Sequence, residues 1–212
     1  HYQRETEAKV LAMGCWVSAF PRAAAELIND NAIFTHENRD QVLKLFNTTK
    51  IGNAFLNEES VKPNLGNRAR TRSFIKVQEG CNNVCSYCLT RIARGKSRSI
   101  PAEEVVRQIA QSEDLSVKEV VLTGVQIGAW GKDLEGNLRI ADLIEAVLIQ
   151  TSVPRIRISS IEPWDVDERL LACFKDKRLC PHLHLPLQSG SDVILRSMAR
   201  PITTARYREL IE

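Results

Sequence analysis

Three absences narrow the classes of protein to which this sequence can belong. The chain of 212 residues has no apolar run near the roughly 18 residues of a membrane-spanning helix. Its first ten residues, HYQRETEAKV, lack the apolar core of a secretory signal. Neither sign of charge dominates, because 29 Lys and Arg against 26 Asp and Glu give a net charge of +3. We therefore expect no membrane partner and a cytoplasmic location, while a nucleic-acid partner is permitted but not required.

The two ends of the chain indicate a fragment. The sequence begins at His1 rather than Met, and it stops at Glu212 inside the helix-like stretch PITTARYRELIE. We expect a longer parent protein.

The pattern of apolar and polar segments predicts two parts joined by a linker. Residues 1–48 are expected to be part of a small α/β domain, with strands at 9–13 and 32–36 and helices at 21–30 and 39–47. Residues 49–72 are polar and broken by Gly and Pro, so they are expected to form the linker.

Residues 73–212 repeat a strand followed by a helix. The expected strands are 73–80, 118–124, 154–160 and 182–188, and the expected helices are 101–114, 137–150, 165–174 and 191–199. This alternation predicts an α/β fold with a parallel sheet that forms a barrel or part of one. In such a fold the chemistry lies at the carboxyl ends of the strands. The candidate site is therefore built from the loops EGCNNVCSYC, TGVQIGAWG, SSIEPWD and LQSGSD.

Half of the six cysteines stand within eight positions of the first of these loops. Cys81, Cys85 and Cys88 are separated by three and then by two residues. Disulfides are rare in the cytoplasm, and structural zinc needs a fourth ligand, for which two later cysteines and two histidines remain. Three thiolates suit a 4Fe–4S cluster with one iron left open. The spacing favours such a cluster, with a non-enzymatic metal-binding module as the alternative.

The pattern CxxxCxxC, with Tyr87 before the last cysteine, resembles the cluster loop of the radical S-adenosylmethionine enzymes. The resemblance implies that Cys81, Cys85 and Cys88 hold a 4Fe–4S cluster. Its open iron would bind the amino and carboxylate groups of S-adenosylmethionine, which is cleaved to methionine and a 5′-deoxyadenosyl radical. It also implies that residues 73–212 form a partial parallel (β/α) barrel, incomplete at its C-terminal end.

The same resemblance implies further cofactor-binding residues at the ends of the expected strands. The loop after the second strand stands where the family holds the methionine amino group, and polar residues after the third strand commonly meet the ribose or carboxylate. The residues concerned are Tyr87, Gly124, Gln126, Ser159, Ser160 and Glu162. No catalytic residue is assigned.

Longer stretches are similar to one branch of that family, the methylthiotransferases. They are IKVQEGCNNVCSYC, ARGKSRS, LTGVQIGAWGKDL, RISSIEP and PHLHLPLQSGSDVILRSMAR. The last two are most similar to the enzymes that act on N6-threonylcarbamoyl-adenosine at position 37 of tRNA. We therefore expect a transferase that adds a methylthio group to C2 of that nucleoside, although this fragment alone is expected to be inactive. Isopentenyl-adenosine tRNA, a ribosomal-protein aspartate and other radical S-adenosylmethionine reactions remain alternatives.

The front of the chain is also similar to these enzymes. VLAMGC at 10–15 resembles the end of their N-terminal domain, which carries a second 4Fe–4S cluster. Cys15 matches the last of its three ligands, and the other two are expected upstream of His1. The resemblance thus implies two clusters in the parent protein, a tRNA substrate and an electron donor such as flavodoxin or ferredoxin. It leaves the oligomeric state open.

Four basic residues follow the cysteine loop. Arg91, Arg94, Lys96 and Arg98 are expected to meet tRNA phosphates or the cofactor carboxylate, with the cover of a helix end as the alternative.

Aromatic and imidazole side chains also occur near the expected rim. Trp130 and Trp164 lie in rim loops, where they either stack on a base or pack the loop. His182 and His184 would share one face of the expected strand 182–188, either lining the site or filling the core.

Overall fold

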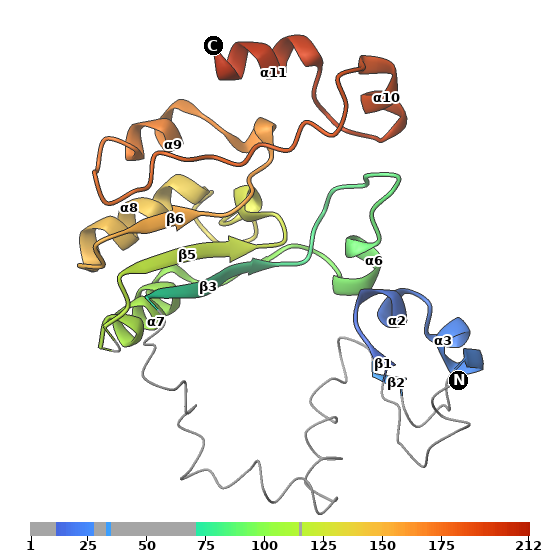
Figure 1. Cartoon of the computed structure of the whole chain (residues 1–212), viewed down its shortest axis with the longest axis horizontal. Coiled ribbons are helices and arrows are strands. Elements are labelled where there is room, and N and C mark those ends of the chain that lie inside the picture. Colours follow the sequence, from blue (N-terminus) through green and yellow to red (C-terminus); the bar gives the residue numbers. More distant parts are fainter. Residues whose placement is uncertain (1–11, 28–32, 35–70, 115) are drawn as a thin grey trace, which may run out of the picture. The chain divides into compact units, whose positions relative to one another are not determined.

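The computed structural model describes residues 12–27, 33–34, 71–114 and 116–212 (Figure 1). These residues belong to two compact units. The first contains 12–27, 33–34 and 89–95, and the second contains 71–88 and 96–212 apart from residue 115. The predicted helix at 39–47 and nearly all of the predicted linker lie outside the described residues.

In the first unit, two short strands pair in parallel. They are β1 (Ala12–Met13) and β2 (Ile33–Phe34), with α2 (Cys15–Ala19) and α3 (Pro21–Leu27) between them in the chain. The helix α6 (Thr90–Arg94) packs against α2. The predicted strands and the helix with Pro at its start are confirmed where they are described. The helix α2 was not predicted, because its five residues are too few to show a helical period. Gly14, at φ 123°, lets the chain turn from β1 directly into this helix.

In the described part of the second unit, four strands form one sheet in the order β4-β3-β5-β6 (Figure 1). The strands β3 (Arg72–Glu79), β5 (Glu119–Gly124) and β6 (Ile156–Ile158) are parallel to one another. The short β4 (Arg98–Ser99) pairs antiparallel with the end of β3. The predicted α/β class and partial parallel barrel are confirmed. β4 was not predicted, since two residues carry no periodicity.

Helices follow the strands as the sequence pattern predicts. The described helices of this unit are α7 (Ala102–Asp114), α8 (Ile140–Gln150), α9 (Glu168–Cys173), α10 (Asp192–Ser197) and α11 (Thr204–Ile211), with 3-10 turns η2 (Ile127–Ala129) and η3 (Pro163–Asp165). α7 follows Pro101 and has Glu103 and Glu104 in its first turn, where negative charge suits the helix dipole. None of the described helices is long and apolar enough to cross a membrane.

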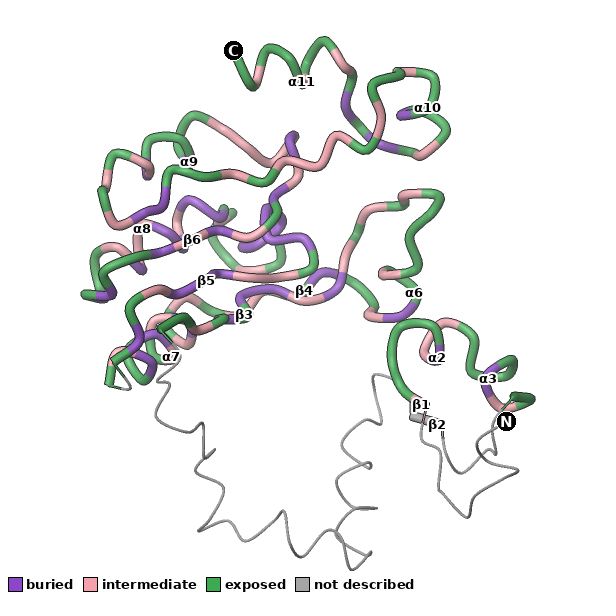
Figure 2. The backbone as a smooth tube through the Cα atoms, viewed as in Figure 1, coloured by how far each residue is buried: buried purple, intermediate pink, exposed green. Residues whose placement is uncertain are grey.

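The core lies between the sheet and the helices α7 and α8. Val120 and Leu122 of β5 are fully buried, as are Ile109 of α7 and Ile144 of α8. Figure 2 shows this concentration of buried residues along β5, β6 and α8. A central parallel strand is covered on both faces, which explains why the whole VVL run of β5 is buried. The core thus fixes the strand ends from which the candidate site extends.

The predicted strand at 182–188 is wrong. These residues are all described, and they form extended chain beside β6 without a regular ladder. An isolated bridge joins Ile156 to Leu179, and the Ile161 N–H donates to the His184 carbonyl over 3.1 Å. Pro181, directly before the segment, and Pro186, within it, have no N–H to donate, which interrupts strand pairing. His182 and His184 therefore do not share a strand face.

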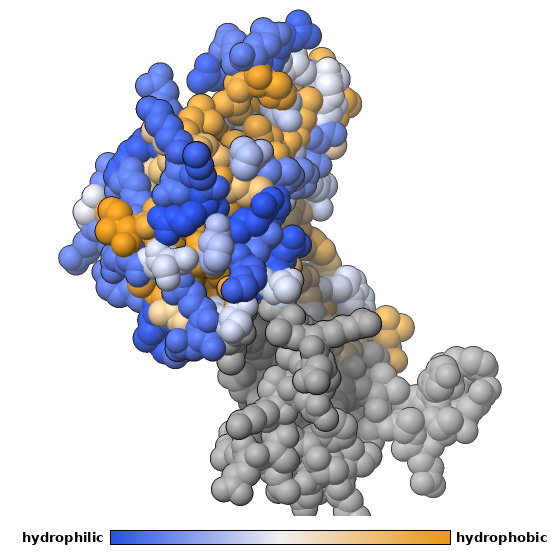
Figure 3. All heavy atoms as spheres, turned by 60° about the vertical axis from the view of Figure 1, so that its left-hand side comes forward, coloured by the Kyte–Doolittle hydropathy of each residue, from blue (hydrophilic) through white to orange (hydrophobic). Residues whose placement is uncertain are grey.

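One carboxylate joins the amino ends of three strands. Glu119 of β5 pairs with Arg72 at 3.0 Å, with Arg157 at 2.9 Å and with Arg155 at 3.2 Å. Burial opposes ionisation of Glu119, but hydrogen bonds from Arg157 and Arg72 hold the pKa of its carboxyl below the usual value. Figure 3 brings this end of β3 and β5 forward and shows mostly hydrophilic residues on the coloured part of the face. The amino ends of the strands are thus stabilised by charge.

Candidate functional site

The three clustered cysteines follow the carboxyl end of β3. Cys81 and Cys85 are partly buried and Cys88 is exposed, and none of the three is in a disulfide. The Cys88 N–H donates to the Cys85 carbonyl over 3.1 Å, which bends the loop. Burial raises the pKa of the Cys81 thiol, the Asn83 N–H opposes the shift, and Cys85 and Cys88 add to it. The thiols are therefore close enough to influence one another electrostatically.

A second contact ties the cysteine loop to a distant part of the chain. The Ser86 N–H donates to the Met198 carbonyl over 3.1 Å, and the Ser86 hydroxyl donates to the Ser197 carbonyl over 3.0 Å. These carbonyls lie at the end of α10, 111 residues further along the chain in the case of Ser197. The loop is thus held at both its strand end and its middle.

Gln78 is the main polar support of the loop, and the sequence analysis did not single it out. The pairing of β3 with β5 shifts register between Lys76 and Gln78, and this bulge buries Val77 and Gln78 together. The Gln78 amide nitrogen donates to the carbonyls of Glu79 and Gly80 at 2.9 and 2.8 Å, and to the Ser97 hydroxyl at 2.8 Å. Its oxygen accepts the Gln126 N–H at 2.7 Å. In the sequence, the one feature that could have indicated this role of Gln78 is its position directly before Glu79, Gly80 and Cys81.

The loop after β5 brings Gln126 to the cluster loop. The Cys81 thiol donates to the side-chain oxygen of Gln126 over 3.2 Å. Gly124 lies against Gln78, and a Cβ added there would stand 3.0 Å from the Gln78 carbonyl oxygen. Close packing against Gln78 thus explains why a glycine occupies position 124. Gln126, in contrast, contacts Cys81, the first cysteine of the motif.

The loop after β6 contains three polar residues in different environments. The Ser159 N–H donates to the Leu122 carbonyl at 3.0 Å, but its hydroxyl is buried with no hydrogen-bond partner among the described residues. The Ser160 hydroxyl lies 2.6 Å from His184 Nδ1. Glu162 forms a bidentate pair with Arg200, at 2.9 and 2.7 Å. Ser159 therefore has unused hydrogen-bonding capacity at the strand end.

Arg200 was also missed by the sequence analysis. Its side chain is 1% exposed, its guanidinium lies 4.6 Å from the centre of the Trp164 ring, and one nitrogen donates to the Pro186 carbonyl. Burial raises the pKa of Tyr87, and the charge of Arg200 opposes that shift. The residue follows the end of α10, so no local pattern in the sequence relates it to Glu162.

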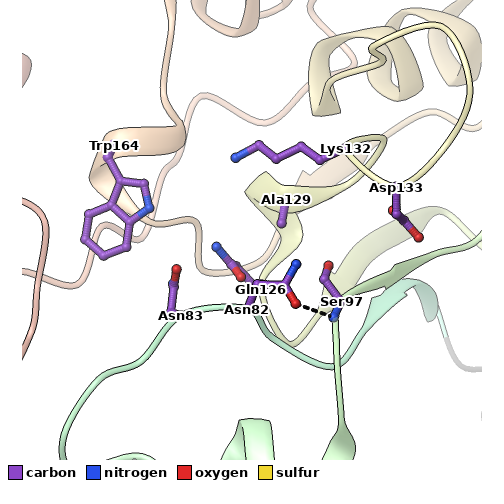
Figure 4. A pocket seen from close by; sticks show the side chains of 8 residues that line it. All are labelled: Asn82, Asn83, Ser97, Gln126, Ala129, Lys132, Asp133 and Trp164. Atoms are coloured by element: carbon purple, nitrogen blue, oxygen red, sulfur yellow. Dashed lines mark hydrogen bonds between the residues drawn. The ribbon is translucent and has the colours of Figure 1, made fainter.

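A cavity of about 210 Å³ lies beside these loops (Figure 4). Most of the residues that line it are polar or charged, and they come from the segments after β3, β5 and β6. They are Asn82, Asn83, Ser97, Gln126, Ala129, Lys132, Asp133 and Trp164. The dashed line in Figure 4 marks the bond from the Ser97 N–H to the Asn82 side chain. The strand ends thus meet at a polar hollow next to the cysteine loop.

The two rim tryptophans differ. Trp130 is fully buried and donates its indole N–H to the Ile100 carbonyl at 2.8 Å, so it packs the loop and does not stack on a base. Trp164 is partly exposed and lines the cavity.

Of the four basic residues, Arg91 and Arg94 lie in α6 of the first unit, whereas Lys96 and Arg98 belong to the second. Cys15, the predicted ligand of another cluster, is exposed at the start of α2.

The donor set fits an iron–sulfur cluster with a bound cofactor. In the described part of the chain, no group of three or more His, Cys, Asp or Glu side chains is arranged to hold one metal ion. In a 4Fe–4S cluster each thiolate binds a different iron atom, so the thiols need not meet at a single point. Three cysteines on one loop, none of them in a disulfide, match that chemistry, and the unpartnered hydroxyl of Ser159 suits a polar ligand nearby.

Comparisons with known proteins bear on the same residues. The Radical SAM superfamily model matches residues 75–212. The threonylcarbamoyladenosine tRNA methylthiotransferase MtaB of Thermotoga maritima is 34% identical over 99% of this chain. The MtaB of Chlamydia pneumoniae is 42% identical over 68% of it. The tRNA-2-methylthio-N(6)-dimethylallyladenosine synthase of Geobacter sulfurreducens is 37% identical over 71% of it.

This chain corresponds to only part of those proteins. It covers 49% of the Thermotoga protein and 34% of each of the other two, so the chain spans about half the length, or less, of these relatives. Among solved structures, the radical S-adenosylmethionine methyltransferase TsrM from Kitasatospora setae matches with a TM-score of 0.53 at 12% identity. The match covers 66% of this chain and 27% of that one, and it bears on the fold alone. Since the family model matches well over half of the residues, the chain belongs to the Radical SAM superfamily.

Proposed function

We propose that the chain is part of a tRNA methylthiotransferase that adds a methylthio group to C2 of N6-threonylcarbamoyl-adenosine. One observation carries the proposal. The similarity to the MtaB proteins of Thermotoga maritima and Aquifex aeolicus extends over 99% of the chain, and therefore includes the first unit as well as the barrel. A radical enzyme that shared only the cluster loop would not account for the match of residues before the barrel.

The proposal gives roles to the clustered and isolated cysteines. Cys81, Cys85 and Cys88 hold the radical 4Fe–4S cluster, and Cys15 is one ligand of a second cluster whose other ligands are supplied from outside this chain. None of these cysteines is in a disulfide, which supports both roles. In the same proposal, residues 1–48 are part of the N-terminal methylthiotransferase domain, 49–72 are the linker and 73–212 are the radical domain.

The remaining site residues position the cofactors. When bound, the reduced cluster and S-adenosylmethionine together supply the 5′-deoxyadenosyl radical that removes a hydrogen atom. Before the cluster binds, the Cys81 thiol donates to the side-chain oxygen of Gln126, and Gln78 holds the Gln126 N–H. As a cluster ligand Cys81 is a thiolate without that proton, which leaves the Gln126 side chain to the cofactor. The buried Ser159 hydroxyl is a free partner for the ribose or carboxylate of the cofactor. Tyr87, Ser160 and Glu162 border the same rim, and Arg200 holds Glu162 in place.

The proposed partners follow from the proposed activity. The substrate is tRNA, and Lys96 and Arg98 are both exposed shortly after the cluster loop in the chain, where they would meet its phosphates. A low-potential donor such as flavodoxin or ferredoxin would reduce the cluster. We therefore also propose a cytoplasmic location for the parent enzyme.

A second candidate is the modification of dimethylallyl-adenosine in tRNA. Three synthases of that modification are 34–37% identical over 66–82% of this chain. The alternative differs in the chemistry of the N6 group, which is a hydrocarbon rather than a threonylcarbamoyl group.

Analysis of tRNA from cells that lack the parent gene separates the two. After complementation with the full-length parent protein, we expect mass spectrometry of the nucleosides to detect methylthiolated threonylcarbamoyl-adenosine. A Cys85→Ala variant is expected to restore none. Methylthiolated dimethylallyl-adenosine, in place of the threonylcarbamoyl product, would refute the proposal.

A further inference from the structure

The cavity beside the cysteine loop contains one cationic side chain, Lys132, among the residues that line it. In Figure 4 the side chain extends from the segment after η2 toward the segment that carries Trp164. Its ammonium donates to the Asp165 carboxylate over 2.7 Å. An ammonium has three N–H donors, so donors remain for a further acceptor, and the side chain is 52% exposed.

The position of Lys132 is fixed by packing beneath it. Asp165 is 3% exposed and its second carboxylate oxygen has no partner among the described residues. A Cβ added to Gly128 would stand 2.3 Å from the Asp165 Cβ, so only glycine lets the carboxylate approach this closely. Gly128 therefore admits Asp165, and Asp165 holds the ammonium of Lys132 at the cavity.

The size of the cavity suits one group of a ligand. Pockets that enclose a whole drug-sized molecule measure about 300–1,000 Å³, whereas this cavity measures about 210 Å³. Its other polar side chains include Asn82, Asn83 and Gln126, which offer amide donors and acceptors. Asp133 also lines the cavity, and its carboxylate oxygens accept from the Ser99 N–H and hydroxyl. A small group with a carboxylate and hydrogen-bonding atoms matches these features, and a purely hydrocarbon group does not.

We propose that this cavity receives the threonyl part of the modified adenosine and that Lys132 pairs with its carboxylate. The inference rests on the proposed function and names the residue that selects the substrate. S-adenosylmethionine also carries a carboxylate, but that group is expected on the open iron of the cluster. The threonyl carboxylate is then the group that needs a cation from the protein. The dimethylallyl group has no carboxylate and needs no such cation.

A binding experiment that varies both partners tests this pairing. The anaerobically reconstituted chain is titrated with N6-threonylcarbamoyl-adenosine, with its analogue in which a primary amide replaces the carboxylate, with dimethylallyl-adenosine and with S-adenosylmethionine. Each titration is repeated on Lys132→Met and on Lys118→Met. Lys118 is exposed directly before β5, at the opposite end of the sheet, so it is a matched control for the loss of one positive charge.

We expect the unaltered chain and Lys118→Met to bind the acid about tenfold more tightly than the amide. Lys132→Met is expected to bind the two equally and to keep its affinity for S-adenosylmethionine. The inference is overturned if Lys132→Met retains the preference, if the unaltered chain shows none, or if Lys132→Met weakens S-adenosylmethionine instead. Tighter binding of dimethylallyl-adenosine than of both threonyl compounds would instead refute the proposed function itself.

Discussion

Replacing Gln78 with Leu should disconnect the loops that carry the candidate site. The change keeps a side chain of similar size in the buried bulge but removes hydrogen bonds to Glu79, Gly80, Ser97 and Gln126. Each buried polar group left without a partner costs about 1–3 kcal/mol. Because four groups lose a partner, the free energy of unfolding is expected to fall by at least about 3 kcal/mol.

Urea denaturation followed by tryptophan fluorescence measures that loss, because Trp130 is fully buried in the same unit. The iron content after anaerobic reconstitution is expected to fall as well, since Gln126 and the start of the cysteine loop lose their common support. Gln150→Leu, an exposed position at the end of α8, is the control and should change stability by less than about 0.5 kcal/mol. If Gln78→Leu loses no more stability than this control and takes up iron normally, the reasoning is refuted.

Three further predictions follow from individual contacts. Glu119→Gln should lower the free energy of unfolding by about 1 kcal/mol near pH 7, because three arginines lose their carboxylate. The pKa of Glu119 is lowered in the folded chain. The stability that Glu119 contributes is therefore complete above the unfolded pKa of about 4.3, and it is lost as the pH falls through the lower folded pKa. If urea titrations give the same stability difference between the unaltered chain and Glu119→Gln at pH 3 and at pH 7, this reasoning is wrong. Gly128→Ala should lower the free energy of unfolding by about 2 kcal/mol, because the new Cβ would overlap Asp165. A melting temperature equal to that of the unaltered chain would show that Gly128 and Asp165 are not packed this closely. Arg200→Met should cost about 3 kcal/mol in urea denaturation by leaving Glu162 without its buried partner, whereas an unchanged midpoint would mean that the pair adds nothing.

The regular elements of the second unit were predictable because their periodicity is local. The apolar spacing of α7 and α8 and the apolar run of β5 each reflect burial against an adjacent layer. The segment 182–188 alternates like a strand, but Pro181 before it and Pro186 within it cannot donate to a ladder, so the predicted strand does not form. Local pattern therefore identified the layers but not every strand.

The candidate site was predictable only in part, for the same physical reason. The cysteine spacing lies within one loop, so the sequence shows it directly. Gln78 was hidden because a bulge, which depends on pairing with β5, turns it inward. Arg200 reaches Glu162 across 38 residues, and Lys132 reaches Asp165 across 33, so neither pair leaves a local pattern. Contacts between distant segments require the fold.

The most direct test of the central claim is electron paramagnetic resonance of the anaerobically reconstituted and reduced chain, with and without S-adenosylmethionine. The account predicts a 4Fe–4S signal that shifts when the cofactor is added and that is missing in Cys85→Ala. A folded chain that binds zinc but no iron, or a cluster signal that does not respond to the cofactor, would contradict the account.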